Sequence, residues 1–338
     1  MSLRLFCYGL LILSAALSAR AESSDPELQK LIQHGNQELG QGVARSALFD
    51  FEKAEKRSNN TSAQAFWGEA RAHYQLGEYK EAAAACQKVI TLEKDPPSLA
   101  LVHNYAGMAL VQASNKKNDK LLKEAEEEFR AALTNSNGSS VHMNLGLVLI
   151  YQGRVDEGIA ELKQAQAIAS PPSTRLQRLI DHPELAKLDL APEFSAKTLD
   201  GESIDIDGLQ GKVVLLDFWA SWCYPCRTTL PKLKKEYAKL SSEPVVFLSI
   251  SADESEEKLR DFLASDKPLW AQVYDANDNI RTMYAVRAFP TFFVIGPDGV
   301  IRYRSTGSDD VPIGEVKKQL KQLGAPGGTQ AKAIDTAK

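Results

Sequence analysis

The sequence has few cysteines and histidines, which excludes two kinds of small site or fold. It holds four cysteines and five histidines in 338 residues. That cysteine content is too low for a fold held together mainly by disulfides. A structural zinc site needs four ligands, usually two cysteine pairs or one pair with histidines, and neither residue type follows Cys226. We therefore expect no metal site and no cofactor.

An excess of positive charge is also missing. The formal net charge is −4, and no basic stripe runs along any segment. Binding to nucleic acid usually needs such a stripe, so we expect no nucleic-acid partner. With 43% hydrophobic and 25% charged residues, the composition is that of an ordinary globular protein.

Long apolar runs are confined to the N-terminus. The run Leu5–Ala19 has 15 residues, fewer than the roughly 20 that a spanning helix needs. Arg4 precedes it and Ala19-Arg20-Ala21 follows, which is the pattern of a secretory signal peptide. The sequence predicts a signal peptide at 1–21 and an exported mature protein, periplasmic or otherwise extracytoplasmic, with no membrane attachment after cleavage. The alternative is a retained anchor.

A repeated helical pattern fills the first half of the chain. The stretch "AFWGEARAHYQLGEYKEAAAACQKVITLEKDPP" (65–97) has small residues where two helices would cross, and Gly77 and Tyr79 at the turn between them. The spacing recurs around Gly35, Gly107 and Gly146. It resembles an all-α solenoid of about four tetratricopeptide repeats, over about 28–170 within a domain at 22–170. A generic helical bundle is the alternative.

The first helices of such an array line a concave groove that binds partner segments. The residues predicted to line this groove are Trp67, Arg71, Tyr74, Met143, Leu147 and Ile150. We expect them to bind peptide segments of protein partners. The alternative is that some of these side chains pack against neighbouring repeats. Cys86, among alanines on a second helix, is expected to be a buried small apolar residue.

Prolines and a change of pattern mark the domain boundary. Pro171 and Pro172 end the last repeat helix, because proline cannot continue one. The segment 171–190 is predicted to be a linker with a short capping helix at Thr174–Ile180. The small, polar segment 324–338 is predicted to be a disordered tail.

Strands alternate with helices between these two segments, over 191–323. A hairpin is expected around Asp200-Gly201 and a second one around Pro297-Asp298-Gly299. Strands are predicted at 212–220, 245–251 and 271–274, and helices from 224, at 255–264 and at 312–323. The strand at 212–220 is almost wholly apolar, as expected at the centre of a sheet covered on both faces. The pattern predicts an α/β domain.

Cys223 and Cys226 follow this strand and open the next helix. Zinc is disfavoured by the missing ligands. A disulfide closing four residues would stabilise the fold by only about 1.9 kcal/mol, so it would be a poor structural link. At a helix start, the free N–H groups and the positive end of the helix dipole lower the pKa of a thiol. Redox chemistry explains the placement best.

The motifs "VVLLDFWASWCYPC" and "AFPTFFVIGPDGVI" resemble the thioredoxin superfamily, and the segment before them is similar to TlpA/ResA-like thiol-disulfide oxidoreductases. This resemblance implies a redox-active disulfide between Cys223, the exposed attacking thiol, and Cys226, the resolving thiol. It makes Asp217 the buried acid that accepts a proton from Cys226. It also implies a cis-proline at Pro290 beside the cysteines. Trp222, Tyr224 and Pro225 would form the active-site dipeptide and its flank.

Two positions depart from the family. Thr229 stands where many TlpA/ResA-like proteins have a glutamate, and Ser249 stands in place of the lysine beside the buried acid of thioredoxins. Without that lysine, desolvation should raise the pKa of Asp217 more strongly. The Tyr-Pro dipeptide lacks the histidine of strong oxidants, so we expect a reductase or isomerase-like potential.

The leading hypothesis is an exported thiol-disulfide oxidoreductase whose repeats recruit protein partners. Its partners would be protein dithiols and disulfides and an electron-donor protein. One alternative is a thiol peroxidase, although residues 216–223, "LDFWASWC", lack the Pro-x-x-x-Thr-x-x-Cys loop of peroxiredoxins. Another is a scaffold in which the repeats carry the function and the cysteines are incidental.

Overall fold

Paired helices form the first part of the chain in the computed structural model, which describes residues 25–324. The chain divides between Lys187 and Leu188 into two units. The predicted signal peptide, and all but the first residue of the predicted tail, lie outside the described residues. Over the described range, no helix combines the length and apolar character needed to cross a membrane.

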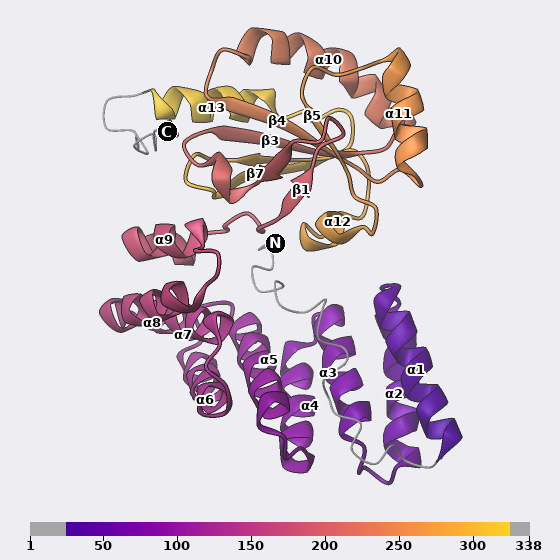
Figure 1. Ribbon diagram of the computed structural model, residues 1–338, viewed down its shortest axis with the longest axis vertical. Helices are drawn as coiled ribbons and strands as arrows, with labels where there is room; N and C mark the ends of the chain where they lie inside the picture. Colours follow the sequence, from indigo (N-terminus) through magenta and orange to yellow (C-terminus); the bar gives the residue numbers. More distant parts are fainter. Residues whose placement is uncertain (1–24, 325–338) are drawn as a thin grey trace. The chain divides into compact units, whose positions relative to one another are not determined.

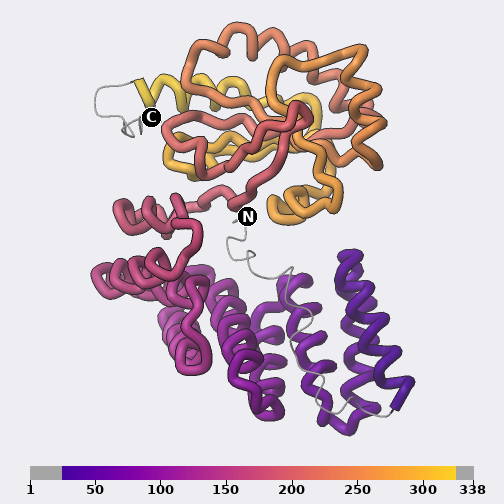
Figure 2. The backbone as a smooth tube through the Cα atoms, viewed as in Figure 1, coloured from indigo at the N-terminus to yellow at the C-terminus, as the bar shows by residue number. Residues whose placement is uncertain are grey.

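Each helix of the first unit packs against the next in an antiparallel pair (Figure 2). The pairs are α1 (Pro26–Gly40) with α2 (Ala44–Arg57), α3 (Ala63–Leu76) with α4 (Tyr79–Leu92), α5 (Pro96–Ser114) with α6 (Asp119–Asn135), and α7 (Ser139–Tyr151) with α8 (Val155–Ile168). A short helix α9 (Thr174–Asp181) and a 3₁₀ turn η1 (Pro183–Lys187) follow. The predicted helical repeats are confirmed.

Aromatic side chains facing glycines hold the helices together. Phe51 of α2 is fully buried and lies against Gly35 and Gly68, where an added Cβ would meet its ring at 2.8 and 2.2 Å. Phe129 of α6 lies against Gly107 in the same way. Gly35 and Gly107 are therefore positions where a ring of a second helix takes the place of a side chain, whereas an added Cβ at Gly146 would meet the carbonyl oxygen of Gly158 at 2.8 Å.

The predicted groove residues are mostly packed inside the unit, so this prediction needs correction. The rings of Trp67 and Tyr74 lie 4.9 and 5.1 Å from that of Tyr105 in the next repeat. Leu147 and Ile150 are buried as well. Packing against a neighbouring repeat, the alternative, is therefore favoured for Trp67 and Tyr74, while Leu147 and Ile150 are buried within the unit.

Two of the predicted groove residues stay partly exposed, namely Arg71 and Met143. Arg71 donates a hydrogen bond to Asn36 of the preceding repeat. Cys86 is fully buried and unpaired as a thiol, as expected, and burial raises its pKa.

A five-stranded sheet in the order β5-β4-β3-β6-β7 forms the second unit (Figure 1). β3, β4 and β5 are parallel, and β6 and β7 are antiparallel to their neighbours. The strands are β3 (Val213–Trp219), β4 (Val245–Ser251), β5 (Ala271–Tyr274), β6 (Thr291–Ile295) and β7 (Ile301–Thr306), with a separate hairpin of β1 (Ser195–Lys197) and β2 (Ser203–Asp205). The predicted strands and both hairpins are confirmed.

Helices cover both faces of this sheet. Side chains of α10 (Tyr224–Leu240), α11 (Glu256–Ser265) and α13 (Ile313–Leu323) pack on one face, in a cluster with Leu215, Trp219 and the two cysteines at the start of α10. The other face carries α12 (Asn279–Met283) and the β1–β2 hairpin. Every residue of β3 is consequently buried, as its unbroken apolar sequence predicts. The α/β thioredoxin-like fold is confirmed.

Candidate active site

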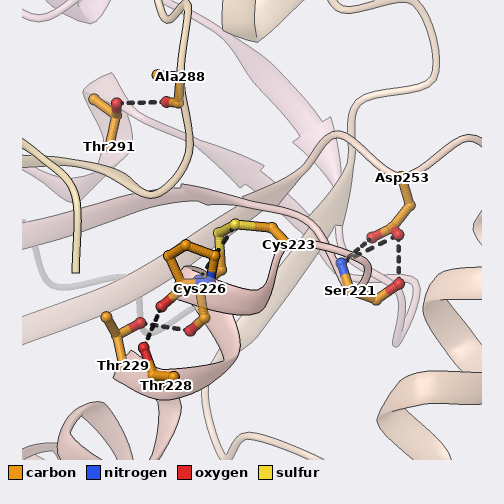
Figure 3. The surroundings of a disulfide bond; sticks show 9 residues. Ser221, Cys223, Cys226, Thr228, Thr229, Asp253, Ala288 and Thr291 are labelled. Carbon is orange, nitrogen blue, oxygen red and sulfur yellow. Dashed lines mark hydrogen bonds between the residues drawn. A yellow bond between two sulfur atoms is a disulfide. The ribbon is translucent and has the colours of Figure 1, made fainter.

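The two cysteines stand at the N-terminus of α10. Cys223 is the N-cap residue, and its Sγ accepts a hydrogen bond from the backbone N–H of Cys226 at 3.3 Å. The two sulfurs form a disulfide, with the Cα atoms 5.3 Å apart. Pro225 lies in the first turn, where its missing N–H costs no helical hydrogen bond. Figure 3 shows the disulfide at the start of the helix.

The cysteines differ less in exposure than the resemblance implies. Cys223 is 5% exposed and Cys226 is 1% exposed. The description of Cys223 as an exposed thiol is therefore wrong for this disulfide form, although it is the more accessible of the two. The flanking residues are open instead, with Trp222 60% and Tyr224 74% exposed.

Asp217 lies in the middle of β3, on the cysteine-bearing face of the sheet. Its side chain points to the same face of the sheet as those of Leu215 and Trp219, two positions away on either side, and these two pack in the same cluster as Cys226. Burial raises the pKa of Asp217 to about 7, and a hydrogen bond from Ser249 acts in the opposite direction. The carboxyl oxygen Oδ2 accepts that bond at 3.2 Å, whereas Oδ1 has no hydrogen-bond donor in the part of the chain described.

Pro290 precedes β6, which pairs with β3 in the sheet. The Phe289–Pro290 peptide bond is cis, as the resemblance implies. Thr291 stands opposite Phe218 of β3, so this segment meets the carboxyl end of the strand that leads to the cysteines. The rings of Phe289 and Trp222 are 6.0 Å apart, edge to face. The proline segment and the cysteine segment are thus neighbours.

Asp253 supports the cysteine segment and was not foreseen from the sequence. It follows the end of β4 and accepts hydrogen bonds from the backbone N–H and the hydroxyl of Ser221, the hydroxyl bond measuring 2.5 Å. The hydroxyl of Ser251 also donates to it at 2.6 Å. Figure 3 shows this carboxylate beside Ser221. The sequence did contain a signal for this contact, namely an acidic residue just after a strand that is parallel to β3. The carboxyl ends of parallel strands lie at the same edge of a sheet, so such a residue can reach the segment that follows β3.

Thr229 replaces a carboxylate with a hydroxyl that is already bonded. Its Oγ1 donates to the carbonyl oxygen of Cys226 at 2.7 Å (Figure 3). A threonine hydroxyl stays neutral across the physiological pH range, so it cannot act as a proton acceptor in the way that a carboxylate does. Of the residues that the resemblance assigns to the site, Asp217 is left as the buried carboxyl group.

Potential metal ligands gather at one place in the first unit. His34, Glu38 and Asp50 bring ligand-type atoms within 4.8 Å of one another. His34 Nδ1 and Asp50 Oδ2 are already hydrogen-bonded at 2.5 Å, and the imidazole is exposed. This group is explained by pairing between α1 and α2.

Comparison with known proteins gives matches in both units. Residues 188–304 match the AhpC/TSA family, and residues 32–98 match the tetratricopeptide repeat. The chain is similar to the thioredoxin-like protein YneN of Bacillus subtilis, with 39% identity over 137 residues, which are 39% of this chain and 75% of that protein. It is 30% identical over 131 residues to the thiol-disulfide oxidoreductase ResA of Bacillus cereus, covering 39% of this chain and 72% of that protein.

One solved structure is similar to part of the chain. The thioredoxin domain of a thiol-disulfide oxidoreductase from Bacteroides vulgatus is 28% identical to the chain. The alignment covers 38% of this chain and 95% of that domain, with a TM-score of 0.36.

Proposed function

The chain belongs to the thioredoxin-like thiol-disulfide oxidoreductases, and on that premise we propose that it exchanges disulfides with protein substrates through Cys223 and Cys226. The observation that carries this proposal is the placement of the pair. Cys223 is the N-cap residue of α10 and its sulfur accepts the N–H of Cys226, and both cysteines pack on the face of the sheet that also holds the buried Asp217.

The chemistry begins with the reduced pair. The Cys223 thiolate attacks a disulfide sulfur of the substrate, so a mixed disulfide forms and one substrate thiolate leaves. The Cys226 thiolate then attacks the sulfur of Cys223, which releases the second substrate thiolate and forms the Cys223–Cys226 disulfide. Two electrons pass from the pair to the substrate. A donor protein with a dithiol must return them for another cycle.

Asp217 supplies the proton step in this scheme. Cys226 is almost wholly buried, and burial in apolar surroundings disfavours a thiolate. A nearby base is therefore needed to take its proton. With a pKa of about 7, Asp217 can accept a proton near neutral pH and return it.

The repeat unit recruits protein partners in this proposal, because tetratricopeptide repeats bind proteins. Holding a partner near the cysteines raises its effective concentration. Arg71 and Met143, which stay partly exposed, are the predicted groove residues left to contribute. We also propose that residues 1–21 direct export to an extracytoplasmic compartment, where disulfides persist.

Thiol peroxidase activity is the second candidate, because residues 188–304 match the AhpC/TSA family. The test compares the reduced protein with a Cys223→Ser/Cys226→Ser variant, each given a protein disulfide or hydrogen peroxide. We expect the wild type to reduce the disulfide in a cysteine-dependent way and to consume peroxide no faster than the variant. Rapid cysteine-dependent peroxide consumption without disulfide reduction would favour the peroxidase. If the variant keeps both activities at the wild-type level, the cysteines are incidental and the scaffold hypothesis is favoured.

A further inference from the structure

Three buried side chains form a line of hydrogen bonds that ends at Asp217. The indole Nε1–H of Trp270 donates to Ser249 Oγ at 2.8 Å. Ser249 Oγ donates to Asp217 Oδ2 at 3.2 Å. Trp270 lies directly before β5, while Ser249 in β4 stands opposite Asp217 in β3. The line therefore runs across the sheet toward the centre.

The direction of these bonds follows from the groups involved. An indole N–H can only donate, whereas a hydroxyl donates one proton and accepts through its lone pairs. Trp270 donates to a lone pair of the Ser249 hydroxyl oxygen, so the single hydroxyl hydrogen is left to donate a hydrogen bond to Asp217. This hydrogen bond is strongest when the carboxyl group of Asp217 is ionised. The arrangement thus favours the ionised form of an otherwise poorly solvated acid.

We propose that Ser249 and Trp270 are positioning residues for disulfide exchange, which keep one hydroxyl donor aimed at Asp217 and so set the pH range in which Asp217 takes the proton of Cys226. The proposal rests on the proposed function, since it needs Asp217 as the proton acceptor. Neither residue touches the substrate or the sulfurs in this scheme. They act through Asp217.

The surroundings of Asp217 make this hydroxyl decisive. Burial raises the pKa of Asp217, and the bond from Ser249 is what opposes that rise. Its other oxygen has no hydrogen-bond donor among residues 25–324. On the strands beside β3, the facing residues are Ser249 and Phe292, neither of which carries a charge.

Other titratable groups lie on α10 and in the adjoining cluster. They are Cys223, Cys226, Tyr237 and Tyr274. The ring of Tyr237 is 5.5 Å from that of Trp270, whereas the Tyr274 hydroxyl donates to the carbonyl oxygen of Glu254. On β5, the neighbour of Ser249 is Gln272, whose amide donates to the Trp270 carbonyl at 3.3 Å and does not titrate. Tyr237 is the titratable group in ring contact with Trp270, so its contribution needs a control.

The test follows the resolving step directly. Reduced full-length protein is mixed with Ellman's reagent, an aromatic disulfide. The first thionitrobenzoate released reports attack by one cysteine, and the second reports release of the mixed disulfide by the other. The second rate is measured against pH for the wild type, Ser249→Ala and Trp270→Phe. Tyr237→Phe is the matched control, and Asp217→Asn tests the proton acceptor itself.

We expect the midpoint of the second rate to move to higher pH by about one unit in Ser249→Ala, since one net hydrogen bond to the ionised form is lost. Trp270→Phe should move it in the same direction by less, and Tyr237→Phe should leave it in place. In Asp217→Asn the midpoint should disappear, and adding Ser249→Ala should then change nothing.

Failure of the positioning role can be distinguished from failure of the proton-acceptor role of Asp217. If Asp217→Asn abolishes the midpoint while Ser249→Ala and Trp270→Phe both leave it at the wild-type pH, the positioning role is overturned and the proton acceptor stands. If Asp217→Asn itself keeps the wild-type profile, the proton-acceptor role in the proposed function fails, and the positioning role fails with it. Using two variants guards against one of them failing to fold.

Discussion

Asp253 accepts hydrogen bonds from both the backbone N–H and the hydroxyl of Ser221, two residues before Cys223. It is buried and reaches Ser221 from the segment just after β4, the strand next to β3. The contact ties the turn between β3 and α10 to the end of β4. Because the cysteines follow this turn directly, Asp253 helps to fix where α10 begins.

Removal of this contact should weaken the fold and the site together. Hydrogen bonds to a charged group contribute about 1.5–3 kcal/mol each, so we expect Asp253→Ala to lower the free energy of unfolding of the oxidised protein by about 2 kcal/mol or more. Ser221→Ala, which keeps the backbone bond, should cost less. Urea unfolding measures both. Equal and negligible losses in the two variants would mean that the conformation of the turn does not depend on Asp253.

The buried Asp217 should make stability depend on pH. Burial raises the pKa of this acid from 3.8 to about 7, so between those values the folded state holds a proton that the unfolded state has lost. Stability must then fall as the pH rises from about 4 to about 7, and level off above. Asp217→Asn should remove this loss, so above pH 7 the free energy of unfolding should be higher in the variant by up to about 4 kcal/mol. Urea unfolding of the oxidised protein across this pH range measures it.

Glu236 offers a control of opposite sign. Hydrogen bonds from Lys239 and Lys317 lower its pKa from 4.5 to about 2. Its contribution is present above about pH 4.5 and is lost as the pH falls toward 2, so Glu236→Gln should cost stability at neutral pH and nothing at the acid end. If Asp217→Asn and wild-type protein show the same pH dependence, Asp217 is not buried as a neutral acid at low pH.

The repeats predict a steric effect at Gly68. An added Cβ would lie 2.2 Å from a ring carbon of Phe51, and Phe51 is fully enclosed. We expect Gly68→Ala to lower the melting temperature, with a cost of about 1–3 kcal/mol for overpacking. Gly40→Ala is the matched helical control, because nothing lies within 4 Å of its added Cβ, and it should be neutral or slightly stabilising. Similar behaviour of both variants would contradict the proposed packing.

Sequence patterns predicted the strands and repeat helices because each element has a strong local signal. The apolar run at Val213–Trp219 could be placed only at the centre of a covered sheet, and the glycines of the repeats marked helix contacts. The short α12 begins after Asp278, in the left-handed region with φ 55°. Five residues of helix give no periodic pattern, so this element could not be predicted.

The predicted site was incomplete for a different reason. Cysteines, Asp217 and Pro290 belong to motifs with fixed spacing, whereas Asp253 reaches Ser221 across 32 residues of chain. The prediction for the repeat groove missed how its side chains pack. The pattern put Trp67 and Tyr74 on one helix face, but it could not show that Tyr105 of the next repeat occupies the space in front of them.

The central claim, that Cys223 attacks and Cys226 resolves, is tested most directly by trapping the mixed disulfide. Cys226→Ala leaves the more accessible thiol and removes the one that cleaves the intermediate, so full-length protein expressed in cells should run on non-reducing gels as disulfide-linked adducts that reductant dissolves. Cys223→Ala should form none, because Cys226 is only 1% exposed. If Cys226→Ala traps no partner, or Cys223→Ala traps as much, the assigned roles are wrong.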